Sequence, residues 1–106
     1  MNLHQSLAQG RWGNLTLAEQ LGNVGSEFAR ASAWLRQGDN EKTLAAADRF
    51  FELINLTVAD PRWKNCRRRE LARVRECAAE ELQSQALSES LQNYFDQFAW
   101  LARTKR

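Results

Sequence analysis

The sequence predicts an all-α protein, a four-helix up-and-down bundle preceded by an irregular N-terminal tail. Ala and Leu together number twenty-nine, whereas the β-branched Val, Ile and Thr number only eight, and this balance favours helices over strands. One proline and five glycines leave few points at which a helix must break. A length of 106 residues is typical of one domain. We therefore divide the chain into a tail, residues 1–14, and one helical domain, residues 15–106.

The first helix is predicted to begin at Thr16. Thr16 and Glu19 have the spacing of a capping box, in which the hydroxyl and the carboxylate satisfy the first amides of a helix. Apolar residues then recur at alternating intervals of four and three: Leu17, Leu21, Val24, Phe28, Ala31 and Leu35. Gly38 is predicted to end the helix, since glycine readily adopts the left-handed conformation that follows a last turn.

The second helix follows after a short link and is predicted to be capped by Asp39 or Asn40. Its apolar stripe is Leu44, Ala47, Phe51, Ile54 and Val58, widened by Phe50 and Leu53. Such a wide stripe indicates a helix covered on two sides. Because the link is short, the first two helices should be antiparallel neighbours.

The third helix has two possible starts, at Asp60-Pro61 or, after an irregular turn, near Asn65. Its predicted stripe is Cys66, Leu71, Val74, Cys77, Ala78 and Leu82. Three helical turns hold the two cysteines too far apart for a disulfide, so we expect free thiols. We also expect both thiols to be buried, because free cysteine is among the most buried residue types. A polar connection over residues 83–88 leads to a fourth helix from about Ser88 to Arg103, with the stripe Leu87, Leu91, Tyr94, Phe95, Phe98, Leu101 and Ala102.

Several classes of function are poorly supported by the sequence. The only histidine is His4, in the predicted tail, so histidine-based acid–base pairs, nucleophile systems and multi-histidine metal sites are absent. No glycine-rich phosphate loop occurs. The N-terminus lacks the pattern of a signal peptide, and no apolar run is long enough to span a membrane. We predict a cytoplasmic protein that is not an enzyme and has no catalytic, cofactor-binding or metal-binding residues and no membrane partner.

A polar stripe lies beside the apolar stripe of the first helix. It consists of Asn23, Glu27, Arg30 and Trp34, spaced at intervals of four, three and four. Glu27 and Arg30 can pair at this spacing. We favour an ordinary solvated face with a surface ion pair, and we keep an internal polar network or a ligand-binding cluster as alternatives.

Two further features favour self-association. Small residues, including Gly22, Gly25 and Ala29, form another stripe on the first helix, which indicates close packing of a large group. That group is an aromatic side chain of the fourth helix or a second copy of the protein, with a ligand that approaches the backbone as a less favoured alternative. Aromatic residues of the fourth helix, including Tyr94, Phe98 and Trp100, cover more than one face, and aromatics are frequent in subunit contacts. We predict a homodimer that uses these six residues.

A basic segment precedes and begins the third helix. It holds seven basic residues against the single acid Glu70: Arg62, Lys64, Arg67, Arg68, Arg69, Arg73 and Arg75. Such a density of cations can attract phosphate backbones. Nucleic-acid surfaces usually add exposed aromatics, and only Trp63 lies within this segment. We therefore favour pairing of these residues with carboxylates of neighbouring helices, with an anion or nucleic-acid surface as the alternative.

Four segments carry a resemblance: LAEQLGNVGSEFARA, FFELINLTVADPR, RRRELARVRE and NYFDQFAWLAR. In this order they resemble a family of short bacterial proteins that has no assigned activity. The resemblance covers about residues 15–103 and implies a compact helical bundle. A second resemblance is carried by a fifth, overlapping segment, AxxWLRQGDNEKTLAAADRFFEL, which is similar to the helical hairpin of HEPN domains. That class has a nuclease motif of Arg followed by His, and no arginine here precedes a histidine, so this resemblance implies an inactive member.

These observations predict a non-enzymatic cytoplasmic interaction or scaffold module that self-associates and can have a protein partner. A nucleic-acid or anion binder that uses residues 62–75 is the first alternative. A catalytically inactive HEPN-like partner protein is the second.

Overall fold

The computed structural model describes residues 10–104. Its helices are α2 (Leu17–Arg36), α3 (Asn40–Val58), α4 (Cys66–Ser84) and α5 (Glu89–Thr104), preceded by helical residues 10–12. No strand occurs among residues 10–104, so the all-α prediction is confirmed. In this part of the chain, no helix combines the length and apolar character needed to cross a membrane. Predictions about His4 and the rest of residues 1–9 concern a part outside the described residues.

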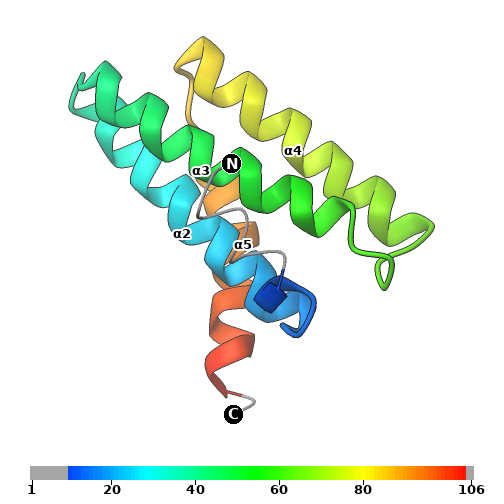
Figure 1. Ribbon diagram of the computed structural model, residues 1–106. Coiled ribbons are helices and arrows are strands. Elements are labelled where there is room, and N and C mark those ends of the chain that lie inside the picture. The colour runs from blue at the N-terminus through cyan, green and yellow to red at the C-terminus, as the bar shows by residue number, and fades with distance from the viewer. Residues whose placement is uncertain (1–9, 105–106) are drawn as a thin grey trace.

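Helix α2 packs mainly against α3 on one side and α5 on the other, and α3 lies between α2 and α4 (Figure 1). The short link after α2 returns α3 alongside it, as predicted, whereas α5 crosses the other helices at an angle. The core is centred on three phenylalanines from three helices. The ring centroid of Phe28 lies 5.5 Å from that of Phe50 and 5.7 Å from that of Phe95.

The ends of α2 follow the sequence signals. The hydroxyl of Thr16 accepts a hydrogen bond from the backbone N–H of Glu19, and the Glu19 carboxylate accepts one from the N–H of Thr16, so the capping box is confirmed. Gly38 has φ of +77° directly after the last turn. The carboxylate of Asp39 then accepts from the N–H of Lys42 and caps α3.

The predicted stripe of α3 is confirmed in part: Phe50, Leu53 and Ile54 are buried, whereas Leu44 is not. Leu44 is 66% exposed, and the buried residues are Thr43, Ala46, Phe50, Leu53, Ile54 and Thr57. Two overlapping stripes satisfy the same spacing, and the packing of Phe50 against Phe28 and Phe95 selects between them. Threonine tolerates burial in this stripe because Thr43 Oγ1 donates to the carbonyl of Asp39.

Helix α4 begins at the later of its two predicted starts. Asn65 precedes it with φ of 57° and makes no side-chain capping bond. The prediction of buried thiols was wrong, because Cys66 and Cys77 are both free and exposed. Helix α4 packs on one narrow side through Leu71, Val74 and Ala78, so its flanking positions remain open to solvent.

The glycine stripe of α2 is covered by α5 of the same chain. A Cβ added to Gly25 would overlap the side chain of Phe95, and one added to Gly22 would lie 3.1 Å from the Cα of Ala99. Of the occupants expected from the sequence, the aromatic of the fourth helix is therefore the one present at Gly25. Gly22 and Gly25 drop out of the predicted dimer surface because their face is already used within the monomer.

Part of the predicted tail belongs to the packed body. Trp12 is only 7% exposed and joins the hydrophobic core. The prediction of an irregular segment over residues 1–14 was thus wrong for residues 10–12.

Candidate functional site

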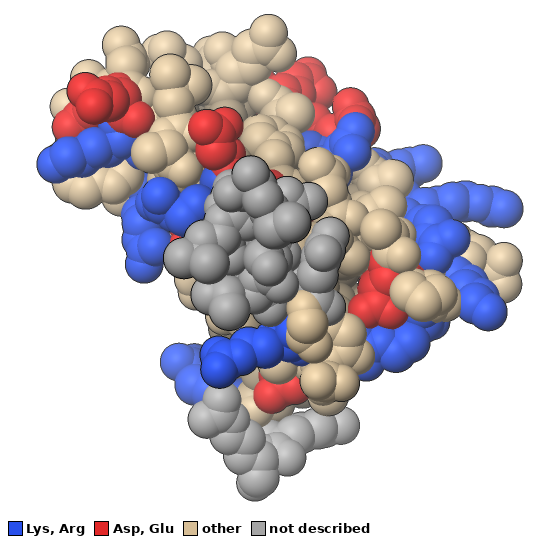
Figure 2. All heavy atoms as spheres, in the orientation of Figure 1, with Lys and Arg blue, Asp and Glu red and all other residues tan. Residues whose placement is uncertain are grey.

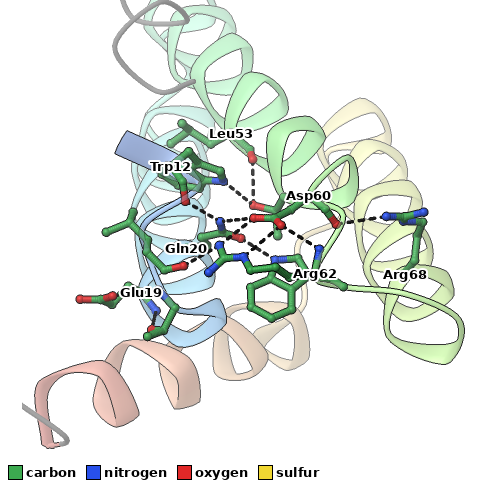
Figure 3. Close-up of polar contacts among 11 residues, drawn as sticks. Trp12, Glu19, Gln20, Leu53, Asp60, Arg62 and Arg68 are labelled. Carbon is green, nitrogen blue, oxygen red and sulfur yellow. Dashed lines mark hydrogen bonds and ion pairs between the residues drawn. The ribbon is translucent and has the colours of Figure 1, made fainter. Parts of the chain in front are cut away.

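A buried polar cluster joins the start of α2 to the link between α3 and α4 (Figure 3). We call it the junction cluster and define it as Trp12, Gln20, Thr57, Asp60, Arg62 and Trp63. The side chains of Gln20 and Thr57 are fully buried, and Asp60 is nearly so. Burial of this many polar groups is tolerated only when each finds hydrogen-bond partners.

Asp60 and Arg62 form the charged centre of the junction cluster. Arg62 Nη2 lies 2.7 Å from Asp60 Oδ2, and both Arg62 Nε and the Arg62 backbone N–H donate to Asp60 Oδ1. These bonds hold the pKa of the Asp60 carboxyl well below its usual range, against the opposing effect of burial. Asp60 is therefore an ionised structural acceptor, and a carboxylate so low in pKa is a poor general base.

The neutral members of the junction cluster complete its hydrogen bonds. Gln20 Nε2 donates to Asp60 Oδ2 at 2.9 Å and to the carbonyl of Trp12 at 2.8 Å. The indole N–H of Trp63 donates to Gln20 Oε1, and that of Trp12 donates to Thr57 Oγ1. The cluster thus fixes Trp12 against the ends of α2 and α3, and its role is architectural.

The basic segment divides into paired and unpaired residues. Arg62 is held in the junction cluster, and Arg68 donates to the carbonyls of Val58 and Asp60. Arg67 pairs with Glu70, and Arg75 contacts Asn55 and Glu76. These four basic residues therefore have partners within the molecule, but none of them bonds a carboxylate of a neighbouring helix, which is the pairing that the sequence favoured.

The other three basic residues, Lys64, Arg69 and Arg73, make no side-chain hydrogen bond or ion pair with any described residue. Arg69 and Arg73 are one helical turn apart and line a shallow surface hollow together with Cys66 and Glu70. Figure 2 shows Lys and Arg side chains gathered on the side of the molecule that carries the α3–α4 link and the N-terminal half of α4. We call Lys64, Arg69 and Arg73 the open cations.

The polar stripe of α2 is not brought together as one site. Glu27 pairs with Arg30 at 2.8 Å, as predicted, and also with Arg49 of α3 at 3.0 Å. The amide of Asn23 donates to the carbonyl of Glu19 in its own helix. The ring of Trp34 lies 4.3 Å from Lys42 Nζ, a cation–π contact. Glu27 therefore links α2 to α3, and the other members make separate local contacts.

The aromatic residues of α5 also differ in their surroundings. Tyr94 donates to Glu70 Oε1 at 2.6 Å, and burial, followed by this hydrogen bond, holds the pKa of Tyr94 well above its usual range. Phe98 is half-buried against Tyr94, with ring centroids 5.2 Å apart. Trp100 is 58% exposed and Ala29 is also exposed. Of the predicted dimer residues, Trp100 is the largest one left open to solvent.

The described residues include no group of three or more His, Cys, Asp or Glu side chains arranged to hold a metal ion. In the comparisons with known proteins, no family model, curated protein or solved structure matches this chain. The two resemblances drawn from the sequence therefore stay predictions.

Proposed function

We propose that this protein is a non-enzymatic binding module for duplex nucleic acid, and that the open cations contact the phosphate backbone. The observation that carries the proposal is the absence of partners for Lys64, Arg69 and Arg73 within a segment whose other cations are all paired. This reverses the preference drawn from the sequence. Internal pairing explains four of the seven basic residues and leaves three aimed at solvent.

The position of these charges at the N-terminus of α4 supports an anionic partner. The first turn of a helix favours negative charge because its backbone amides are unsatisfied, yet the first turn of α4 contains no acid and carries Arg67, Arg68 and Arg69. Asn65 adds no capping bond. The backbone N–H of Arg67 already donates to the carbonyl of Lys64 at 3.2 Å, so a phosphate placed here would meet mainly the guanidinium groups and the positive end of the helix dipole.

The lack of available aromatics favours a duplex over a single strand. Binding of single strands usually depends on bases that stack on exposed aromatic rings. Trp63 is the one aromatic in the basic segment, and its indole N–H bonds Gln20 while Arg62 lies 4.5 Å from its ring. Contacts limited to phosphates carry no sequence information, so binding should tolerate any sequence.

Fluorescence anisotropy with a labelled duplex and the matching single strand tests this proposal. Three phosphate contacts predict that the logarithm of the binding constant falls with the logarithm of salt concentration with a slope of about −2.7. The duplex should bind more tightly than the single strand. Absence of duplex binding at low salt, or a preference for the single strand, would contradict the proposal.

Self-association is a second candidate function, favoured by the 58% exposure of Trp100 on α5. An indole of this exposure is a common anchor of subunit contacts. We further propose that the four helices form an up-and-down bundle, in which such a contact would lie on the outer face of α5. Sedimentation velocity should show a dimer that Trp100→Ala converts to monomer. A monomer at tens of micromolar wild-type protein would contradict this candidate.

A further inference from the structure

A hollow of about 360 Å³ lies between the C-terminal half of α2 and the first turns of α5. It is lined by Phe28, Ala29, Ser32, Arg36, Ser88, Glu89, Gln92 and Asn93. Its volume is within the range of small-molecule sites. It is remote in sequence from the open cations, and the inference below does not depend on the proposed function.

Two residues of the lining each hold a buried polar atom that has no hydrogen-bond partner among the described residues: Ser32 its Oγ and Gln92 its Oε1. Ser32 is only 4% exposed. The amide nitrogen of Gln92 donates to Asp96 Oδ1 at 2.9 Å and to the carbonyl of Gly25 at 3.4 Å, so its oxygen is left as a fixed acceptor. Unpaired buried polar atoms are rare in folded proteins, and each one calls for a partner.

Two charged residues border the same hollow. Arg36 lies in the last turn of α2 and Glu89 in the first turn of α5. Neither side chain forms an ion pair or a hydrogen bond with any other described residue. The lining therefore offers one cation and one anion that are both available, so it is suited to a ligand that carries both signs of charge.

We propose that the hollow binds a small amino-acid-like zwitterion. A guanidinium group binds a carboxylate through two parallel hydrogen bonds, a role that Arg36 can take. A primary ammonium has three donors, which matches the three acceptors Gln92 Oε1, Ser32 Oγ and the Glu89 carboxylate. Serine moves between staggered rotamers, so its hydroxyl can turn toward a bound group.

Calorimetric titration and amide chemical shifts in NMR spectra test the proposal, with L-alanine, L-serine, L-leucine and L-glutamate as probes at millimolar concentration. The tightest of these is then compared with its α-hydroxy acid, which lacks the ammonium, and with its N-trimethyl derivative, which has the charge and no N–H donor. Both analogues should bind at least about tenfold more weakly, as expected for the loss of charge-assisted hydrogen bonds. Failure of all four amino acids to bind, or equal binding of the N-trimethyl derivative, would overturn the proposal.

Variants separate binding from folding. Ser32→Ala should weaken binding about three- to tenfold, the range for one hydrogen bond, and Arg36→Gln should weaken it by more. Ser26→Ala is the matched control, since Ser26 lies outside this hollow and donates to the carbonyl of Gly22; it should leave binding unchanged.

Without ligand, Ser32→Ala should melt at the same or a higher temperature, because it removes an unpaired hydroxyl. A clear fall in its melting temperature would show that the hydroxyl has a structural partner, and would contradict the proposal.

Discussion

Arg68 and Arg69 are adjacent in the first turn of α4, yet their surroundings differ completely. Arg68 Nε and Nη2 donate to the carbonyls of Val58 and Asp60 at 3.0 and 3.1 Å, so Arg68 fastens α4 to the end of α3. The side chain of Arg69 has no partner among the described residues. Successive residues of a helix point about 100° apart, and this rotation alone separates a structural arginine from an open one.

The charge density of a segment therefore does not reveal which of its charges are structural and which are open to a partner. The junction cluster and the carbonyls around it hold Arg62 and Arg68, and these contacts depend on the course of the α3–α4 link. Lys64, Arg69 and Arg73 face outward because no element of the described structure passes over them. We therefore expect different effects when the two groups are substituted: loss of stability for Arg62 and Arg68, and loss of nucleic-acid binding for the open cations.

The largest expected effect comes from Asp60→Ala, which removes the acceptor at the centre of the junction cluster. Arg62 and Gln20 would each lose a partner inside a mostly buried site. We expect the free energy of unfolding to fall by about 2–3 kcal/mol, measured by urea denaturation. If the variant is as stable as the wild type, the cluster does not hold the two ends of the fold together as described.

The pH dependence of stability gives the next effect. The pKa of Asp60 is lowered in the folded protein, so its contribution is fully present above the unfolded value of about 3.9 and is lost as the pH falls further toward the folded value. Wild-type protein should therefore lose stability below about pH 4 more steeply than Asp60→Asn. Urea denaturation at a series of acidic pH values measures both slopes, and parallel slopes would contradict the assignment.

A smaller effect separates the two adjacent arginines. Arg68→Gln should lower the free energy of unfolding by about 1 kcal/mol, because it removes hydrogen bonds to two carbonyls. Arg69→Gln should change it by less than about 0.5 kcal/mol, as is usual for exposed positions without partners. Both variants remove one charge from neighbouring sites, so each is a control for the other. Equal losses of stability would mean that the division into structural and open arginines is wrong.

Much of the fold could be predicted because its signals are local. The capping box at Thr16, the turn at Gly38 and the cap at Asp39 each depend on a few neighbouring residues, and all three are present in the structure. The predicted stripe of α3 includes the buried Phe50 and Ile54 but misplaces Leu44, because two overlapping stripes fit the same spacing and only the long-range packing of Phe50 selects one.

The candidate sites were harder to predict because they join distant parts of the chain. Gln20 meets Asp60 across forty positions, and nothing in its local pattern distinguishes it from a surface residue. The signal that was available is Trp63, an aromatic within a basic segment, whose N–H needs a partner when it is partly buried. The unpaired oxygens of Ser32 and Gln92 depend on the packing of α2 against α5, for which the glycine stripe was the one sequence indication.

If the open cations form a nucleic-acid surface, a matched pair of double variants will differ in how their duplex binding depends on salt. Arg69→Gln/Arg73→Gln removes two open cations, whereas Arg11→Gln/Arg103→Gln removes two exposed arginines elsewhere, with the same change in net charge. For duplex binding measured by anisotropy over a salt series, the first variant should reduce the slope by about 1.8, and the second should leave it close to that of the wild type. Equal slopes for the two variants, or an unchanged slope in the first, would contradict the account.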